Sequence, residues 1–205
     1  MPKKIPYSRI KIAPGLMIRP YELPGPQTDI PFCKDESMVN SYNILSDNYG
    51  WPENIFEVGL EYGGSLLLWH WLGIRSAGID HDIDKFRPKE YCDKNKVGYF
   101  NCTIFDQEKV RGIMDLIYPN GVDWIIDDGP HTIEGIPVGF DVLWGRLRPK
   151  GLYIIEDWSV LWQEHRMQLI DKFVNQMIGN WILKGIQGEI AGIQLFRTMI
   201  VIEKA

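Results

Sequence analysis

Between Asn54 and Asp157, short apolar runs alternate with segments of helical length. The strand-like runs are NIFEVG, SAGID, VGYFNC, VDWIID and GLYIIED, and the helical segments are SLLLWHWLG, DQEKVRGIMDLIY and IPVGFDVLWGRL. Apolar strands separated by helices are typical of a parallel sheet that helices cover on both faces. This alternation predicts an α/β fold with a doubly wound, mostly parallel sheet.

The C-terminal part of the chain is expected to complete this sheet. Residues 165–179 are predicted to form a further helix. Two β-rich runs follow, and the glycines between them predict a hairpin whose turn lies near Gly188–Gly192. Five parallel strands with an antiparallel hairpin at one edge make a sheet of seven strands.

The N-terminal part is rich in proline, with seven of the 13 prolines in the first 31 residues. Proline fixes φ and lacks an amide donor, so residues 1–35 are predicted to be an irregular arm, either a lid or a subunit contact. Helical spacing of apolar residues before Gly50 predicts a helix at 36–50. The chain is expected to be a single domain, residues 1–205, with its core at 54–205, and the arm is compatible with a homo-oligomer.

Composition excludes several kinds of partner. A net charge of -5 and a pI near 5.4 do not provide the basic surface that phosphate backbones require, so no nucleic acid is expected. The three cysteines lack the short paired spacings of a disulfide framework or a zinc site. No apolar run is long enough to span a membrane, and none follows the basic start. These features predict a cytoplasmic protein without a membrane partner.

The segment FEVGLEYGGS predicts a ligand-binding turn between a strand and a helix. Gly59 would allow a sharp turn, and Gly63 and Gly64 would let a ligand approach the backbone; the alternative is an ordinary tight turn. Asp80 ends the next strand about 20 residues later, where an acid can bind ribose hydroxyls, a role that Asp82 could serve instead. The dinucleotide fingerprint and the P-loop lysine are both absent, which favours a single nucleoside such as S-adenosylmethionine.

Acid pairs follow two strands, in DDGPH and in YIIEDW. If these strands are neighbours, Asp128, Glu156 and Asp157 converge on one ion, and oxygen ligands without cysteine favour Mg²⁺, then Mn²⁺ or Ca²⁺. The alternative is that Asp128 caps a helix while the other two are solvated. Asp127 is expected to face the nucleoside, and His131 is the best candidate for a base.

Together, FEVGLEYGGS, AGIDHD, DWIIDDGPH and LRPKGLYIIED resemble the class I S-adenosylmethionine-dependent methyltransferases, with their Rossmann-like fold. More narrowly, they are similar to the metal-dependent sugar O-methyltransferases of the macrocin and mycinamicin type and to the cephalosporin-hydroxylase-like rhamnosyl O-methyltransferases. The resemblance covers about residues 54–160. Phe105 stands where glycine is usual, and Pro130 where serine is usual.

The resemblance implies a role for each matching residue. Mg²⁺ (or Mn²⁺) would be held by Asp128, Glu156 and Asp157, with His131 as the general base. The cofactor S-adenosyl-L-methionine would be contacted by Glu57, Gly59, Gly63 and Ser65 at its methionine end, by Asp80 at the ribose, and by Asp106 and Gln107 near adenine. Independently of the resemblance, Trp158 and Trp162 come just after the acids and are expected either to wall an acceptor pocket or to pack in the core.

The activity that the resemblance implies is Mg²⁺-dependent methylation of a hydroxyl on a sugar, a glycan or another glycosylated small molecule. Two alternatives remain open from the sequence. One is a catechol-type O-methyltransferase acting on a small dihydroxyphenol, which also uses carboxylates and a divalent ion. The other is a protein that binds S-adenosylmethionine without catalysis.

Overall fold

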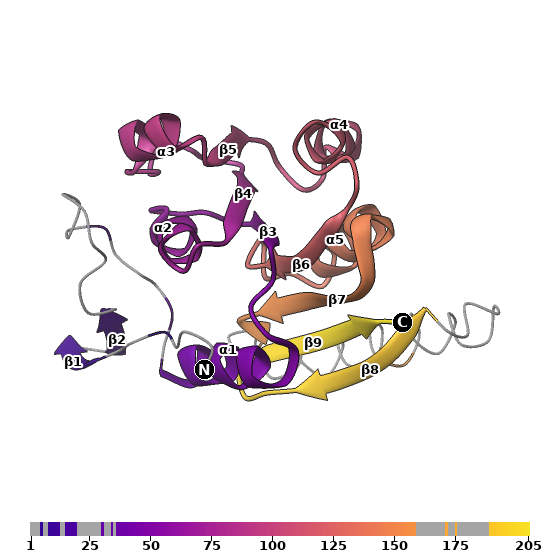
Figure 1. The fold of residues 1–205 in the computed structure, drawn as a ribbon, viewed down its shortest axis with the longest axis horizontal. Helices are drawn as coiled ribbons and strands as arrows, with labels where there is room; N and C mark the ends of the chain where they lie inside the picture. Colours follow the sequence, from indigo (N-terminus) through magenta and orange to yellow (C-terminus); the bar gives the residue numbers. More distant parts are fainter. Residues whose placement is uncertain are drawn as a thin grey trace. The chain divides into compact units, whose positions relative to one another are not determined.

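A computed structural model of the 205-residue chain describes residues 36–158 and 189–205. It also describes the backbone of two short strands, 8–12 and 15–19, and five single residues, which are Ile5, Ile30, Lys34, Asp171 and Asn175. The chain divides into two compact units, Met1–Cys102 and Thr103–Ala205 (Figure 1). All but two residues of the predicted helix at 165–179 lie outside the described residues, as does Trp162.

The first unit contains three parallel strands in the order β5-β4-β3. Its elements after the N-terminal arm are α1 (Glu36–Tyr49), β3 (Asn54–Val58), α2 (Gly64–Trp71), β4 (Arg75–Asp80), α3 (Lys89–Asn95) and β5 (Gly98–Asn101). The strands are those that the apolar runs predict. Helix α2 is buried along most of its length, as its nearly continuous apolar sequence requires.

Helix α1 confirms the prediction for residues 36–50. Met38, Tyr42 and Leu45 share its buried face, and the helix ends just before Gly50, which has a φ of 76°. The ring of Tyr42 packs edge-on against Trp69 of α2, with 5.0 Å between the ring centroids. Burial of these aromatic rings joins α1 to the strand-helix core of the first unit.

The prediction of an irregular arm is wrong for residues 8–12 and 15–19. Strands β1 (Ser8–Ile12) and β2 (Gly15–Arg19) pair antiparallel there. The prolines at 6, 14 and 20 flank these strands and do not interrupt them, so every strand residue keeps its amide donor. Proline excludes a helix from this segment, but it does not exclude a short hairpin.

The second unit contains the remaining strands in the order β6-β7-β9-β8. Its elements are α4 (Gln107–Ile117), β6 (Val122–Asp127), α5 (Gly135–Leu143), the short 3₁₀ helix η1 (Trp144–Arg146), β7 (Leu147–Glu156), β8 (Ile190–Leu195) and β9 (Met199–Lys204). Strands β6 and β7 are parallel, whereas β7–β9 and β8–β9 are antiparallel. Phe140 of α5 packs against Tyr153 of β7, so this helix covers the sheet where the acid pairs lie.

The C-terminal hairpin is confirmed, but the predicted position of its turn is wrong. Gly192 lies inside β8, where the register with β9 shifts between Ile190 and Gly192. The turn is formed by residues 196–198, and it is closed by the amide of Phe196, which donates to the carbonyl of Met199 at 2.8 Å. Glycine can mark an irregularity in the pairing of a strand as well as a turn. Here Gly192 marks the register shift within β8.

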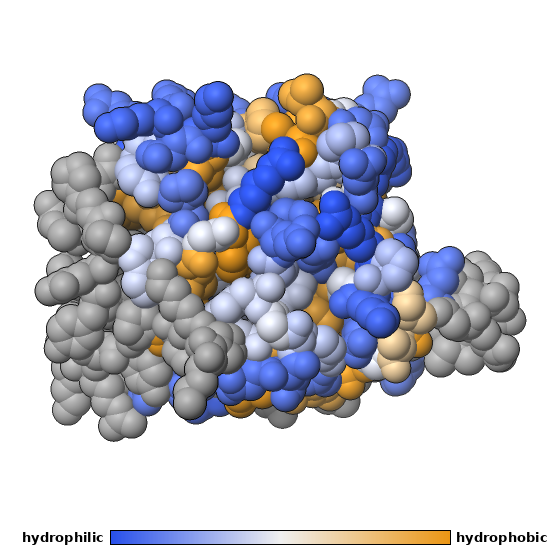
Figure 2. Space-filling view, viewed as in Figure 1, coloured by the Kyte–Doolittle hydropathy of each residue, from blue (hydrophilic) through white to orange (hydrophobic). Residues whose placement is uncertain are grey.

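The predicted fold class is confirmed: the seven strands belong to one mostly parallel sheet with an antiparallel hairpin edge. Figure 2 shows hydrophilic residues over most of the described part of one face, with hydrophobic residues in smaller separate patches. Among the described residues, no helix has both the length and the apolar character needed to cross a membrane.

Candidate active site

Each acid pair divides its two carboxylates between the interior and the surface. Asp127 and Glu156 are the last residues of β6 and β7, and their side chains are buried. Asp128 and Asp157 follow them and are about a quarter to a third exposed. Asp127 and Glu156 are still inside the sheet, whereas Asp128 and Asp157 lie just beyond the strand ends, where the chain leaves the sheet.

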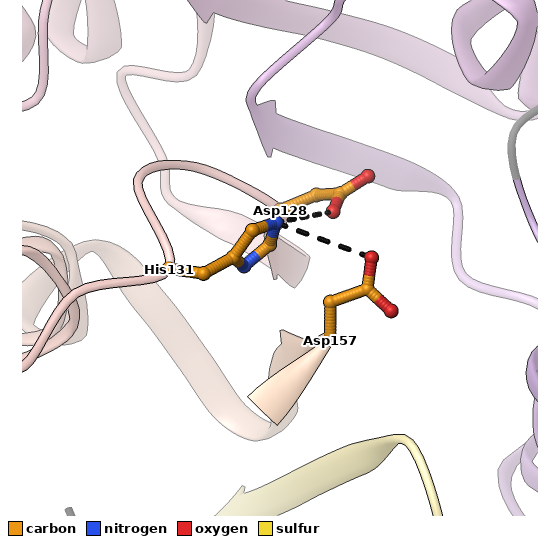
Figure 3. A group of neighbouring side chains, drawn as sticks. All are labelled: Asp128, His131 and Asp157. Carbon is orange, nitrogen blue, oxygen red and sulfur yellow. Dashed lines mark ion pairs between the residues drawn. The ribbon is translucent and has the colours of Figure 1, made fainter. Parts of the chain in front are cut away.

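The two outward acids meet at one imidazole (Figure 3). Nε2 of His131 lies 3.6 Å from Oδ1 of Asp128 and 4.0 Å from Oδ2 of Asp157. One ligand atom of each residue lies within 4.8 Å of the other two. Parallel pairing of β6 with β7 brings the ends of these strands together, and the loop after Asp128 returns His131 to the same point. We call Asp128, His131 and Asp157 the DHD cluster.

The DHD cluster fits a divalent cation. Two carboxylate oxygens and one imidazole nitrogen at this separation can approach one ion at about 2.0–2.3 Å each. A predominantly oxygen donor set without thiolate favours Mg²⁺ or Mn²⁺. Among the described residues, His131 completes this group, and Glu156 does not belong to it. The assignment of Glu156 as a third carboxylate ligand stays a prediction.

Asp127 is held inside the protein beneath the DHD cluster. Its Oδ2 accepts a hydrogen bond from the hydroxyl of Tyr153 at 2.7 Å, and the carboxylate also accepts one from the backbone N–H of Gly129. A Cβ on Gly139 of α5 would lie 2.6 Å from this Oδ2, so glycine is needed there for the carboxylate to fit. These contacts place the carboxylate in the layer between α5 and β7, where it supports the loop that carries Asp128 and His131.

Burial raises the pKa of Asp127 from 3.8 to about 6, although the Tyr153 hydroxyl, the Gly129 N–H and His131 act in the opposite direction. Between pH 4 and 6 the folded protein keeps this proton while the unfolded chain loses it, so this group's contribution to the free energy of unfolding falls as pH rises. The full loss is on the order of 3 kcal/mol and is complete above about pH 6–7.

We therefore expect wild type to lose stability relative to D127N between pH 4 and 6, and the difference to become constant above pH 7. Urea unfolding of both proteins in chelator-containing buffer measures it, because the other carboxylates cancel in the comparison. A difference that grows in favour of wild type as pH rises would contradict a buried, hard-to-ionise Asp127.

The glycine turn after β3 is organised by Asp80. Oδ2 of Asp80 accepts hydrogen bonds from the backbone amides of Leu60 at 2.7 Å and Glu61 at 2.9 Å, and Oδ1 accepts one from the amide of Asp82 at 2.8 Å. Gly59 and Gly63 have φ values of 87° and 84°, the left-handed region that glycine adopts without strain. Asp80, which the sequence predicts to bind ribose, therefore fixes the shape of the turn. Its contact with ribose stays a prediction.

Packing also requires glycine at position 63, which the sequence does not indicate. A Cβ there would lie 2.5 Å from Cε2 of Phe86 and 2.7 Å from both Cγ and Cδ of Pro88. The loop before α3 therefore lies directly on the glycine turn. Arg87 strengthens this contact. Its amide donates to the carbonyl of Tyr62 at 3.3 Å, and its guanidinium lies 4.9 Å from the centroid of the Tyr62 ring.

Glu57, predicted at the methionine end of the cofactor, is fully buried on β3. Its Oε2 accepts a hydrogen bond from Nε1 of Trp69 at 3.2 Å, and its Oε1 lies 3.7 Å from Nζ of Lys34, which is itself 2% exposed. A buried carboxylate needs such a partner, because an unpaired charge in the core is strongly destabilising. Ser65 lies in the first turn of α2 and is half-buried.

Asp106 and Gln107 lie at the start of α4, and both are exposed. Asp106 is the N-cap of this helix, and its carboxylate accepts a hydrogen bond from the amide of Lys109 at 3.2 Å. Oε1 of Gln107 accepts one from Nη2 of Arg111 at 3.1 Å. Capping gives Asp106 a structural role beside its predicted contact with adenine, which stays a prediction.

Sequence reasoning missed two residues that contact buried carboxylates: Lys34, which lies beside Glu57, and Tyr153, which donates a hydrogen bond to Asp127. Lys34 gave no signal, because a single lysine in a proline-rich segment carries no periodicity. Tyr153 gave a weak one: a tyrosine inside a continuous apolar strand must bury its hydroxyl, and a buried hydroxyl needs a partner. The partner is Asp127.

No model of a protein family matches the sequence. Over 96 residues, it is 35% identical to 8-demethyl-8-alpha-L-rhamnosyl tetracenomycin-C 2'-O-methyltransferase of Streptomyces olivaceus. These residues make up 46% of this chain and 24% of the relative. Over 102 residues, it is 31% identical to demethylmacrocin O-methyltransferase of Streptomyces fradiae, covering 49% of this chain and 24% of the relative. This chain resembles sugar O-methyltransferases. It spans about a quarter of the length of these curated relatives.

Comparison of structures supports the same fold. The MycE methyltransferase of the mycinamycin biosynthetic pathway, solved in complex with Mg, SAH and mycinamycin VI, matches with a TM-score of 0.64 at 21% identity. The match covers 83% of this chain and 50% of that one. A match at this identity shows the fold alone, and it agrees with the doubly wound, mostly parallel sheet that the strand and helix pattern predicts.

Proposed function

We propose that this chain is an S-adenosylmethionine- and Mg²⁺-dependent O-methyltransferase that acts on a hydroxyl of a sugar or of a glycosylated natural product. The observation that carries the proposal is the DHD cluster, in which two carboxylates and an imidazole from neighbouring strand ends converge. The resemblance to sugar O-methyltransferases supports the class of acceptor.

The DHD cluster supplies the groups that the reaction needs on the acceptor side. A divalent cation bound there would lower the pKa of an acceptor hydroxyl and orient it. In this proposal the carboxylates of Asp128 and Asp157 would hold the cation, and Nε2 of His131 would stay uncoordinated and accept the hydroxyl proton, because it is the ring nitrogen that faces them. The two carboxylates would stabilise the imidazolium that forms.

The glycine turn supplies the groups on the cofactor side. Asp80 and the close packing of Phe86 on Gly63 fix the backbone between Gly59 and Gly63, so the turn is formed before a ligand arrives. A preformed site reduces the loss of conformational freedom on binding. This turn would hold the methionine end of S-adenosylmethionine, and positioning of methyl and hydroxyl would account for much of the rate.

The test has two stages. Titration calorimetry with S-adenosylmethionine is expected to show binding, and a titration with Mg²⁺ or Mn²⁺ is expected to show a separate metal site. Mass spectrometry of acceptor mixtures is then expected to show gain of one methyl group on glycosylated acceptors. Excess EDTA is expected to stop this transfer, and added Mg²⁺ to restore it.

Three results would contradict the proposal in different ways. Transfer to dihydroxyphenols but not to sugars would favour a catechol-type enzyme. Transfer that EDTA does not affect would exclude the metal role. Binding of S-adenosylmethionine without transfer to any acceptor would favour a binding protein without catalysis.

A further inference from the structure

Asp157 of the DHD cluster has an unusual backbone conformation. Its φ is 54°, in the left-handed region that few residues other than glycine adopt. Asparagine and aspartate tolerate this region better than most side chains, but it still has an energetic cost that the surrounding structure must offset. The left-handed turn comes immediately after β7, and in Figure 3 it directs the carboxylate of Asp157 toward His131.

Both neighbours of Asp157 are anchored. Before it, Glu156 is fully buried and lies opposite Met199 in the ladder with β9. After it, Nε1 of Trp158 donates a hydrogen bond to the carbonyl of Phe196 at 3.2 Å. That carbonyl belongs to the turn of the β8–β9 hairpin, which the Phe196 amide closes by donating to Met199. The hairpin turn therefore offers a fixed point outside the strand that carries Asp157.

We propose that Trp158 is a positioning residue whose hydrogen bond to Phe196 holds Asp157 in its left-handed conformation and thereby sets the geometry of the DHD cluster. Without this bond the chain after Glu156 is free to relax to ordinary φ values, and the Asp157 carboxylate would turn away from His131. This role differs from both predictions for Trp158, an acceptor wall and ordinary core packing. Its effect on metal binding rests on the proposed function.

The variant that tests this is W158F, which keeps an aromatic ring and removes only the indole N–H. Loss of a residue that orients metal ligands typically weakens metal binding about 10–100-fold. We expect W158F to bind Mn²⁺ at least about tenfold more weakly than wild type in a calorimetric titration. Affinity for S-adenosylmethionine is expected to stay within about twofold, because the variant leaves the glycine turn unchanged.

A matched control is W144F. Nε1 of Trp144 donates a hydrogen bond to Oε2 of Glu189 at 3.1 Å, so the control loses a bond of the same kind in the same unit, but not one next to the DHD cluster. It is expected to bind Mn²⁺ as wild type does. Equal Mn²⁺ affinity of W158F and W144F would overturn the proposal.

A measurement without metal separates failure of this proposal from failure of the proposed function. Glycine at 157 removes the left-handed strain, so the effect of W158F on stability should depend on whether residue 157 is aspartate or glycine. In a cycle of W158F, D157G and the double variant with EDTA present, we expect an interaction of at least about fivefold in the unfolding constant. Additive effects of the two substitutions would overturn the proposal that Trp158 holds Asp157 in its left-handed conformation, even if wild type bound no metal. A non-additive effect would support that proposal whether or not metal binds.

Discussion

Methyl transfer by D128N is expected to be at least about 100-fold slower than by wild type, because the variant loses a charge that both the cation and His131 require. Asparagine has nearly the size of aspartate, so the fold should persist. The change removes one of the two carboxylates that converge on Nε2 of His131. Initial rates at saturating Mg²⁺ measure the effect on His131, and the calorimetric affinity for Mn²⁺ measures the effect on cation binding.

Two controls make the result specific to the DHD cluster. D115N neutralises an aspartate of α4 that is 59% exposed and paired with Arg146, and it should leave transfer nearly unchanged, since surface pairs contribute little. Binding of S-adenosylmethionine by D128N should equal that of wild type. Wild-type rates in D128N would show that the cluster takes no part in the reaction.

A double variant asks whether Asp128 and His131 act as one unit. If the imidazole works only beside the carboxylate, H131Q and D128N/H131Q should be about equally slow, because residues that act together have non-additive effects. Independent roles would instead multiply the two losses. Comparison of the three rates decides between them.

The second large effect is expected on stability, from alanine at Gly63. This residue has a φ of 84° and no room for a Cβ, since Phe86 and Pro88 lie within 3 Å of that position. The left-handed conformation costs alanine about 1–2 kcal/mol, and overpacking typically adds about 1–3 kcal/mol. G63A should therefore lose roughly 2–5 kcal/mol of unfolding free energy.

Gly73 provides the matched control, because its φ is also 84° but nothing lies within 4 Å of its would-be Cβ. G73A should lose only the conformational part, roughly 1–2 kcal/mol. Urea unfolding without ligand measures both. Equal losses in the two variants would show that packing on Phe86 and Pro88 does not matter, and that the left-handed conformation alone accounts for the loss.

Much of the fold was predictable because it depends on local pattern. The runs NIFEVG, VDWIID and GLYIIED became β3, β6 and most of β7, and the amphipathic segment after Asp106 became α4. Apolar strands and helices of these lengths can bury their surfaces only by stacking into a helix-covered sheet. The errors arose where one residue type has two structural uses: the arm prolines flank β1 and β2, and Gly192 lies within β8.

By itself, the sequence determined that acid pairs leave the ends of two strands, since DDG and EDW follow continuous apolar runs. Only the tertiary structure decided how each pair divides. Asp127 and Glu156 point inward, Asp128 and Asp157 outward, and His131 completes the cluster. The physical reason is that the direction of each acid depends on the register of its strand and on the residue at which that strand ends. Tertiary packing sets both, and two adjacent acids in a sequence do not encode them.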